Sequence, residues 1–289
     1  MKRGYFMYIA ALCLFGSNGV VALNIALESY QIVMLRTLIA SIFLCLAYFV
    51  SGGRMRALEY KKDMACIAVS GAAMGISWIF LFEAYVLAGV SIPTLAYYCG
   101  PVVVMALSPF IFGEKITILK IAGLGSVAAG MLLVNGAELQ SGGISRGLFY
   151  GLAAALMYSF MVIFNKKAKN VTGLENSAMQ MCVACAVSTV YAVGKGLPSI
   201  AGVIEFAVPV MFLGLINTGV GCYLYFTSIQ KLPAASVAVC GYLEPLSALL
   251  FSAVMLNETL SCAQLLGAAL IIGGAAMGEL LGAGLKNRR

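Results

Sequence analysis

Apolar runs of about 20 residues, the length that crosses a bilayer as a helix, follow one another along the whole chain. Short polar links separate them. The pattern predicts an all-α integral membrane protein with ten transmembrane helices. The predicted spans are residues 5–23, 30–50, 64–86, 92–112, 117–135, 146–165, 174–193, 206–226, 234–255 and 262–283. No long polar stretch remains, so residues 1–289 are predicted to form a single membrane domain.

Composition and charge support this interpretation. The chain is 62% hydrophobic and 10% charged, whereas a soluble domain carries about a quarter charged residues. If the links alternate between the two sides, 15 of the 18 Lys and Arg residues fall on the side of the N-terminus. By the positive-inside rule both termini are cytoplasmic, in a multi-pass protein of the cell membrane. The net charge of +7 therefore sets orientation, and we expect no nucleic-acid partner.

The nine cysteines all fall within predicted spans, and the chain has no histidine. Cys182 and Cys185 form a lone C-x-x-C pair, which without further ligands is weak support for a metal or redox site. Free cysteines commonly behave as small apolar packing residues. We therefore expect no metal site and no cofactor.

An internal repeat divides the chain into two copies of a five-helix unit, residues 1–143 and 144–289. Residues 4–15 resemble residues 147–158 at a shift of 143. A shift of 144 aligns five further pairs: Tyr98 with Tyr242, Pro101 with Pro245, Glu114 with Glu258, Gly123 with Gly267 and Gly130 with Gly274. Because five is odd, the second copy enters the membrane from the opposite side. Inverted repeats of this kind are typical of secondary transporters, whose substrate site lies near the midplane between the halves.

These features resemble the drug/metabolite transporter superfamily, and most closely its EamA-type members. The shared features are the five-plus-five spans, the central prolines of spans four and nine, the helix-ending Glu114 and Glu258, and the stretch YLEP at 242–245. The resemblance covers nearly the whole chain. It implies a helical basket around a central cavity, and transport of a small metabolite.

The sequence therefore predicts a secondary transporter that moves a small organic metabolite, an amino acid, amine or similar compound, across the cell membrane by alternating access. We expect no enzyme, since the chain has neither a G-x-x-x-x-G-K-[ST] phosphate loop nor an evident catalytic constellation. A passive facilitator or a lipid-handling membrane protein is the alternative. The expected partners are the small-molecule substrate, the lipid bilayer and a coupling proton or ion. The protein is expected to be a monomer or a weak homodimer.

Three ionisable residues lie within predicted spans, where such residues are functional candidates. Glu83 has two interpretations: an ion pair with Arg36 that locks two helices together, or binding of a cationic substrate group or proton, which we favour. Glu244 is assigned to coupling or gating, together with Arg36. The matching Pro101 and Pro245 break the backbone hydrogen bonding of their helices and are assigned to the same gating role.

Aromatic residues with few polar groups describe a typical small-molecule pocket, and they can hold an amine through cation–π contact. The predicted substrate-binding residues beside Glu83 are Trp78, Tyr97, Tyr98, Tyr158, Tyr223 and Asn18. The alternatives are interfacial placement of the aromatic residues and a helix–helix hydrogen bond from Asn18. Gly274, Gly278 and Gly282 predict a closely packed helix, and Glu114 and Glu258 are interpreted as structural.

Overall fold

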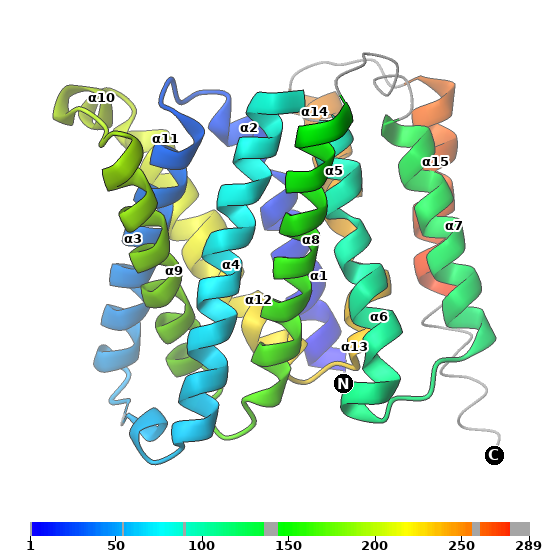
Figure 1. The fold of residues 1–289 in the computed structure, drawn as a ribbon, viewed down its shortest axis with the longest axis horizontal. Coiled ribbons are helices and arrows are strands. Elements are labelled where there is room, and N and C mark those ends of the chain that lie inside the picture. The colour runs from blue at the N-terminus through cyan, green and yellow to red at the C-terminus, as the bar shows by residue number, and fades with distance from the viewer. Residues whose placement is uncertain (1, 54, 89–90, 136–143, 256–260, 278–289) are drawn as a thin grey trace.

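The computed structural model describes residues 2–53, 55–88, 91–135, 144–255 and 261–277. These residues form helices that run back and forth between two ends of the molecule (Figure 1). We call the end that holds the start of α1 (Lys2–Gly16) and η1 (Arg56–Leu58) the N-terminal face. The end that holds α10 (Ile200–Glu205) is called the far face. Across the described ranges there is no strand.

Along the sequence, residues 136–143 separate the helices of the first half of the chain from those of the second half. The first half continues from α1 with α2 (Asn18–Ala22), α3 (Ser29–Val50), η1, α4 (Lys61–Ala88), α5 (Ser91–Tyr97), α6 (Cys99–Phe112) and α7 (Ile118–Asn135). The second half has α8 (Ile144–Lys167), α9 (Gly173–Lys195), α10, α11 (Ala207–Phe212), the π-helix η3 (Leu213–Val220), α12 (Gly221–Ile229), α13 (Ala234–Gly241), α14 (Leu243–Met255) and α15 (Cys262–Ala276).

Seven helical segments of the described chain are long and apolar enough to cross a membrane, and three shorter apolar helices lie among them. Large apolar side chains cover the outside of the bundle, including Phe110 at 86% and Val208 at 82% exposed. Water-soluble monomers rarely expose apolar surface on this scale. The prediction of an all-α, multi-pass membrane protein is confirmed, while the count of ten spans stays a prediction.

Two helices are broken next to the repeated prolines. α5 ends at Tyr97 and α6 begins at Cys99, while α13 ends at Gly241 and α14 begins at Leu243. A proline within a helix provides no N–H for the carbonyl four residues earlier. Tyr98 and Tyr242 stand at the two breaks with almost the same backbone angles, φ −72° with ψ 1° and φ −72° with ψ −3°. The broken helices therefore share one local geometry.

Glycines bring α7 and α15 into close contact. A Cβ atom on Gly130 would lie 2.6 Å from the carbonyl oxygen of Gly267, and one on Gly274 would lie 2.6 Å from that of Gly123. Only residues without a side chain permit such an approach. The close packing predicted at Gly274 is confirmed, whereas Gly278 and Gly282 lie outside the described residues.

Glu114 follows α6 and ties the two halves together at the N-terminal face. Its carboxylate accepts hydrogen bonds from the backbone N–H groups of Ala234, at 2.7 Å, and Ala235, at 3.1 Å. The first N–H groups of a helix have no partner within the helix, so an acidic side chain is favourable there. The structural interpretation of Glu114 is confirmed, and Glu258 lies outside the described residues.

Candidate functional site

A central cavity of about 70 Å³ lies between helices of both halves. Since one buried water needs about 10–15 Å³ by this kind of measure, the cavity has room for several water-sized groups. Its lining from the first half consists of Phe15, Asn18, Arg36, Met74, Ser77, Trp78 and Tyr97. Its lining from the second half consists of Tyr158, Met161, Thr218, Cys222, Tyr225, Phe226 and Glu244. Each half thus provides the same number of residues to a polar and aromatic wall.

Arg36 provides the positive charge of the cavity from α3, about two turns after the start of that helix. Its guanidinium carbon lies 4.0 Å from the centre of the Trp78 ring, which is a favourable cation–π distance. The side chain is only 8% exposed, and its buried Nε has no hydrogen-bond partner. Trp78 therefore stabilises the charge from one face of the guanidinium, while Nε is left without an acceptor.

Glu244 provides the negative charge from the first turn of α14, directly after the helix break at Tyr242. A carboxylate is favourable at this end of a helix because the helix dipole is positive there. Ser247 Oγ donates to the backbone carbonyl of Glu244 at 2.8 Å. The Glu244 carboxylate itself has neither a hydrogen bond nor an ion pair with any residue that the structure describes. Both charged groups of the cavity wall are thus available to a ligand.

The position equivalent to Glu244 in the first half, Gly100, is fixed by packing. A Cβ atom on Gly100 would lie 2.7 Å from the Tyr158 ring and 3.0 Å from the carbonyl oxygen of Ala155 on α8. Ser159 Oγ also donates to the Gly100 carbonyl at 3.0 Å. The close contact of α6 with α8 leaves no space for a side chain, which explains why only one half carries the carboxylate.

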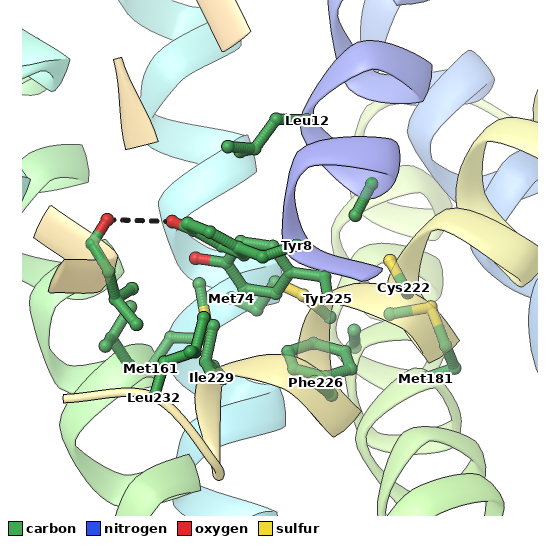
Figure 2. Close-up of a cluster of buried hydrophobic side chains, with 14 of the residues drawn as sticks. Tyr8, Leu12, Met74, Met161, Met181, Cys222, Tyr225, Phe226, Ile229 and Leu232 are labelled. Atoms are coloured by element: carbon green, nitrogen blue, oxygen red, sulfur yellow. Dashed lines mark hydrogen bonds between the residues drawn. The ribbon is translucent and has the colours of Figure 1, made fainter. Parts of the chain in front are cut away.

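Tyrosines close the cavity toward the N-terminal face. The hydroxyl groups of Tyr158 and Tyr225 are 3.0 Å apart and share a hydrogen bond. The Tyr8 ring lies 5.5 Å from that of Tyr225, and its hydroxyl donates to the Val237 carbonyl at 2.9 Å. Figure 2 shows Tyr8 and Tyr225 together with Phe226, Ile229 and Leu232. The side chains of Phe226, Ile229 and Leu232 are at most 2% exposed. This side of the cavity is a packed layer.

A polar cluster joins the cavity to the π-helix η3. Asn217 Nδ2 donates to the Leu14 carbonyl, Ser17 Oγ and Asn18 Oδ1, at 3.0, 2.8 and 2.9 Å. These acceptors lie where α1 ends and α2 begins. Local π-helical geometry often occurs at functional sites. The Asn18 interaction matches the predicted helix–helix hydrogen bond, and Asn18 also lines the cavity.

Six of the predicted site residues line this cavity: Asn18, Arg36, Trp78, Tyr97, Tyr158 and Glu244. Tyr98 instead lies at the helix break and packs on Tyr242, with ring centres 5.8 Å apart. Tyr223 packs against the apolar core. Pro101 and Pro245 flank the breaks without lining the cavity.

Glu83 lies away from the cavity lining. Its carboxylate accepts a short hydrogen bond from the Tyr191 hydroxyl and forms an ion pair with Lys195 at 3.3 Å. The alternative of an Arg36–Glu83 ion pair is wrong, because Glu83 pairs with the end of α9 while Arg36 stacks on Trp78.

Several lining residues were missed at the level of sequence: Phe15, Met74, Ser77, Met161, Thr218, Cys222 and Phe226. The repeat contains a signal that finds some of them. A shift of 144 carries Trp78 onto Cys222 and Met74 onto Thr218. The described residues include no group of three or more His, Cys, Asp or Glu side chains that could hold a metal ion.

The apolar helices and the outward-facing apolar side chains define a multi-pass membrane protein. A family model, the EamA-like transporter family, matches residues 2–136 and again residues 145–278. The chain belongs to the EamA-like transporter family and is a membrane transporter, as the resemblance implied.

Relatives and a solved structure agree with this assignment. The uncharacterized transporter YxxF of Bacillus subtilis (strain 168) is 24% identical over 93% of this chain and 87% of its own length. Its counterpart YoaV from the same organism is 23% identical over 84% of each chain. One crystal structure superposes with a TM-score of 0.84 at 21% identity, covering 99% of both chains, and shows that the fold is shared.

Proposed function

We propose that the protein is a secondary transporter that moves a small organic metabolite, an amino acid, amine or similar polar compound, across the cell membrane by alternating access. The observation that carries the proposal is the cavity between the halves, whose wall holds the opposite charges of Arg36 and Glu244 with no direct ion pair between them in the described residues. Charged groups inside a membrane are costly and usually serve a substrate or ion pathway.

The proposal includes ten spans and two inverted repeats, residues 1–143 and 144–289. Four residue pairs offset by 143 or 144 line the cavity: Phe15 with Tyr158, Asn18 with Met161, Met74 with Thr218 and Trp78 with Cys222. Helix contacts repeat in the same way, since α1 packs on α12 and α14 as α8 packs on α4 and α6. The double match to the family model also supports the repeat.

In this proposal both termini are cytoplasmic, so that the N-terminal face lies inside the cell. Support comes from the starts of α1 and α4 and the end of α8, which lie at this face (Figure 1) and carry Lys2, Arg3, Lys61, Lys62, Lys166 and Lys167. Lys and Arg concentrate on the cytoplasmic side of membrane proteins. The protein would act as a monomer or a weak homodimer.

We assign coupling to Glu244 and hinge motion to the breaks beside Pro101 and Pro245. A carboxylate that faces the cavity can bind a coupling proton or ion when the substrate is absent. Each proline leaves the carbonyl four residues earlier, that of Tyr97 or Gly241, without its usual amide partner, and irregular backbone is tolerated in a membrane where it faces protein or water.

Flux into proteoliposomes tests the proposal. Radiolabelled amino acids and amines are offered with and without an imposed proton or sodium gradient, and Glu244→Gln serves as the coupling variant. Secondary transport predicts accumulation above the outside concentration only when a gradient is present. Equilibration that ignores every gradient would indicate a passive facilitator, and movement of labelled phospholipids between leaflets would indicate lipid handling.

A further inference from the structure

The cavity wall holds one cationic and one anionic side chain, and no direct ion pair joins them within the described residues. We infer that the compound carried by this cavity is a small zwitterion, whose anionic group binds Arg36 and whose cationic group binds at Glu244. The inference rests on the proposed function, because it names the chemistry of the transported compound.

Arg36 has the properties of an anion receptor. A guanidinium offers five N–H donors in a planar fork that matches the two oxygens of a carboxylate or one edge of a phosphate. Trp78 stacks on one face of this plane at 4.0 Å and fixes its orientation. The buried Nε has no partner, which is costly for a desolvated donor. An anionic ligand group would satisfy these donors.

Glu244 provides the complementary acceptor on a helix of the other half. An ionised carboxylate only accepts hydrogen bonds, so its natural ligand group is an ammonium. The rings of Tyr97 and Tyr158 line the same cavity and add faces on which a cation is favourable. A cationic group at Glu244 is thus held from the second half of the chain, while the anionic group is held from the first.

The two charges together exclude compounds with a single charge. The charges of Arg36 and Glu244 balance each other across the cavity, so a simple amine would leave it with a net positive charge and a simple acid with a net negative one. A buried charge that has lost its partner is strongly unfavourable. A zwitterion compensates both charges at once and adds no net charge to the cavity. Selectivity against single charges is therefore built into the wall.

Thermal unfolding of the purified wild-type protein tests the inference, since a ligand of the folded state raises Tm. The probes are the standard amino acids and, for those that bind, their analogues without the carboxylate or without the amine. For leucine these are 3-methylbutylamine and 4-methylpentanoate, and for phenylalanine they are 2-phenylethylamine and 3-phenylpropanoate. We expect an amino acid to bind at least roughly tenfold more tightly than either analogue, as charge-assisted hydrogen bonds require.

Variants separate ligand binding from a structural role. In Arg36→Gln the preference for the amino acid over its amine should fall to about one, because the receptor for the carboxylate is gone. In Glu244→Gln the preference over the matching acid should vanish instead. Arg56, which is exposed and lies 5.8 Å from the Tyr60 ring, provides the control Arg56→Gln. The exposed Glu205 provides Glu205→Gln. Both controls should keep the wild-type preferences.

Three outcomes overturn the inference. One is that no zwitterionic probe raises Tm; another is that a single-charge analogue binds as tightly as its amino acid; the third is that both variants keep the wild-type preferences. Glycerophosphoethanolamine, a phosphate diester that carries the charges of a lipid headgroup, is tested in parallel to distinguish a headgroup from a free amino acid. Flux is measured separately. Binding of a zwitterion without flux would contradict transport but not the zwitterion inference. Flux of an uncharged or singly charged compound would contradict the zwitterion inference but not transport.

Discussion

The Tyr242 hydroxyl donates a 2.6 Å hydrogen bond to the backbone carbonyl of Tyr98, the residue 144 positions earlier in the chain. Each tyrosine stands at the break of its own helix, so the bond joins the two interrupted helices at their breaks. The rings are also in contact, with centres 5.8 Å apart. If the breaks are the hinges of the proposed alternating access, this contact requires them to move together.

The first prediction concerns the contact of α7 with α15. Gly274→Ala places a Cβ atom 2.6 Å from the Gly123 carbonyl oxygen, and overpacking of this kind costs roughly 1–3 kcal/mol. The neighbouring Gly273→Ala is the matched control, because a Cβ atom there meets nothing within 4 Å. Thermal unfolding should show a lower Tm for Gly274→Ala alone. Equal Tm values for the two variants would mean that these helices are not in close contact.

A second prediction concerns Glu114, whose carboxylate caps α13. Glu114→Ala leaves two backbone N–H groups without their charged acceptor, which should lower the free energy of unfolding by roughly 1–3 kcal/mol. The exposed Glu205 provides the control Glu205→Ala, with little expected change. Chemical denaturation in detergent measures both. A Glu114→Ala protein as stable as the control would remove the proposed tie between the halves.

A third prediction concerns Glu83 and Arg36, which the structure separates. Glu83→Gln weakens the half-exposed contact with Lys195 and should cost roughly 1 kcal/mol or less. Arg36→Gln removes the cation–π contact with Trp78 and leaves Glu244 as the sole charge of the cavity wall, so it should lower Tm independently of Glu83. Residues without a shared contact have additive effects. The Tm change of the double variant should equal the sum of the single changes. If the Tm of the double variant lay closer to the wild-type value than that of either single variant, an Arg36–Glu83 ion pair would be supported instead.

The placement of Glu83 illustrates what a single sequence can provide. Apolar runs along the chain indicate where helices lie. The repeat, seen as matching residues 144 positions apart, aligns Tyr98 with Tyr242. The side of a helix that faces the cavity is set by its neighbours. The ion-pair partner of Glu83 is Lys195, which lies at the end of α9 and more than a hundred residues away in the chain. In an evenly apolar helix, the pattern alone does not reveal such a contact.

The charged pair of the site was predictable in part. Arg36 and Glu244 stand out because ionisable residues within a span are rare, and Trp78 stands out as the single tryptophan of the chain. That Arg36 stacks on Trp78 depends on the register of α3 against α4, which the sequence does not specify. The glycine at position 100 is explained only by the approach of Tyr158 and Ala155.

The fourth prediction concerns orientation. In a protein freed of its native cysteines, Glu205→Cys on the far face should react with an impermeant thiol reagent in intact cells. Lys62→Cys, near the start of α4, should react only after the cells are opened. Both positions are exposed, and neither touches the cavity. Labelling in the reverse order would place both termini outside the cell.

Access to the cavity from both faces tests alternating access most directly, and Cys222 is a native probe for it. Cys222 lines the cavity and is 2% exposed, and Tyr158 and Tyr225 close the cavity toward the N-terminal face. The other eight cysteines are replaced, and an impermeant thiol reagent is applied to right-side-out and to inside-out vesicles. Lys62→Cys, in a background without other cysteines, reports which face is exposed. Alternating access predicts that Cys222 reacts from both faces, since the tyrosine layer must open in a second conformation. Reaction of Cys222 in vesicles of only one of the two orientations would contradict alternating access.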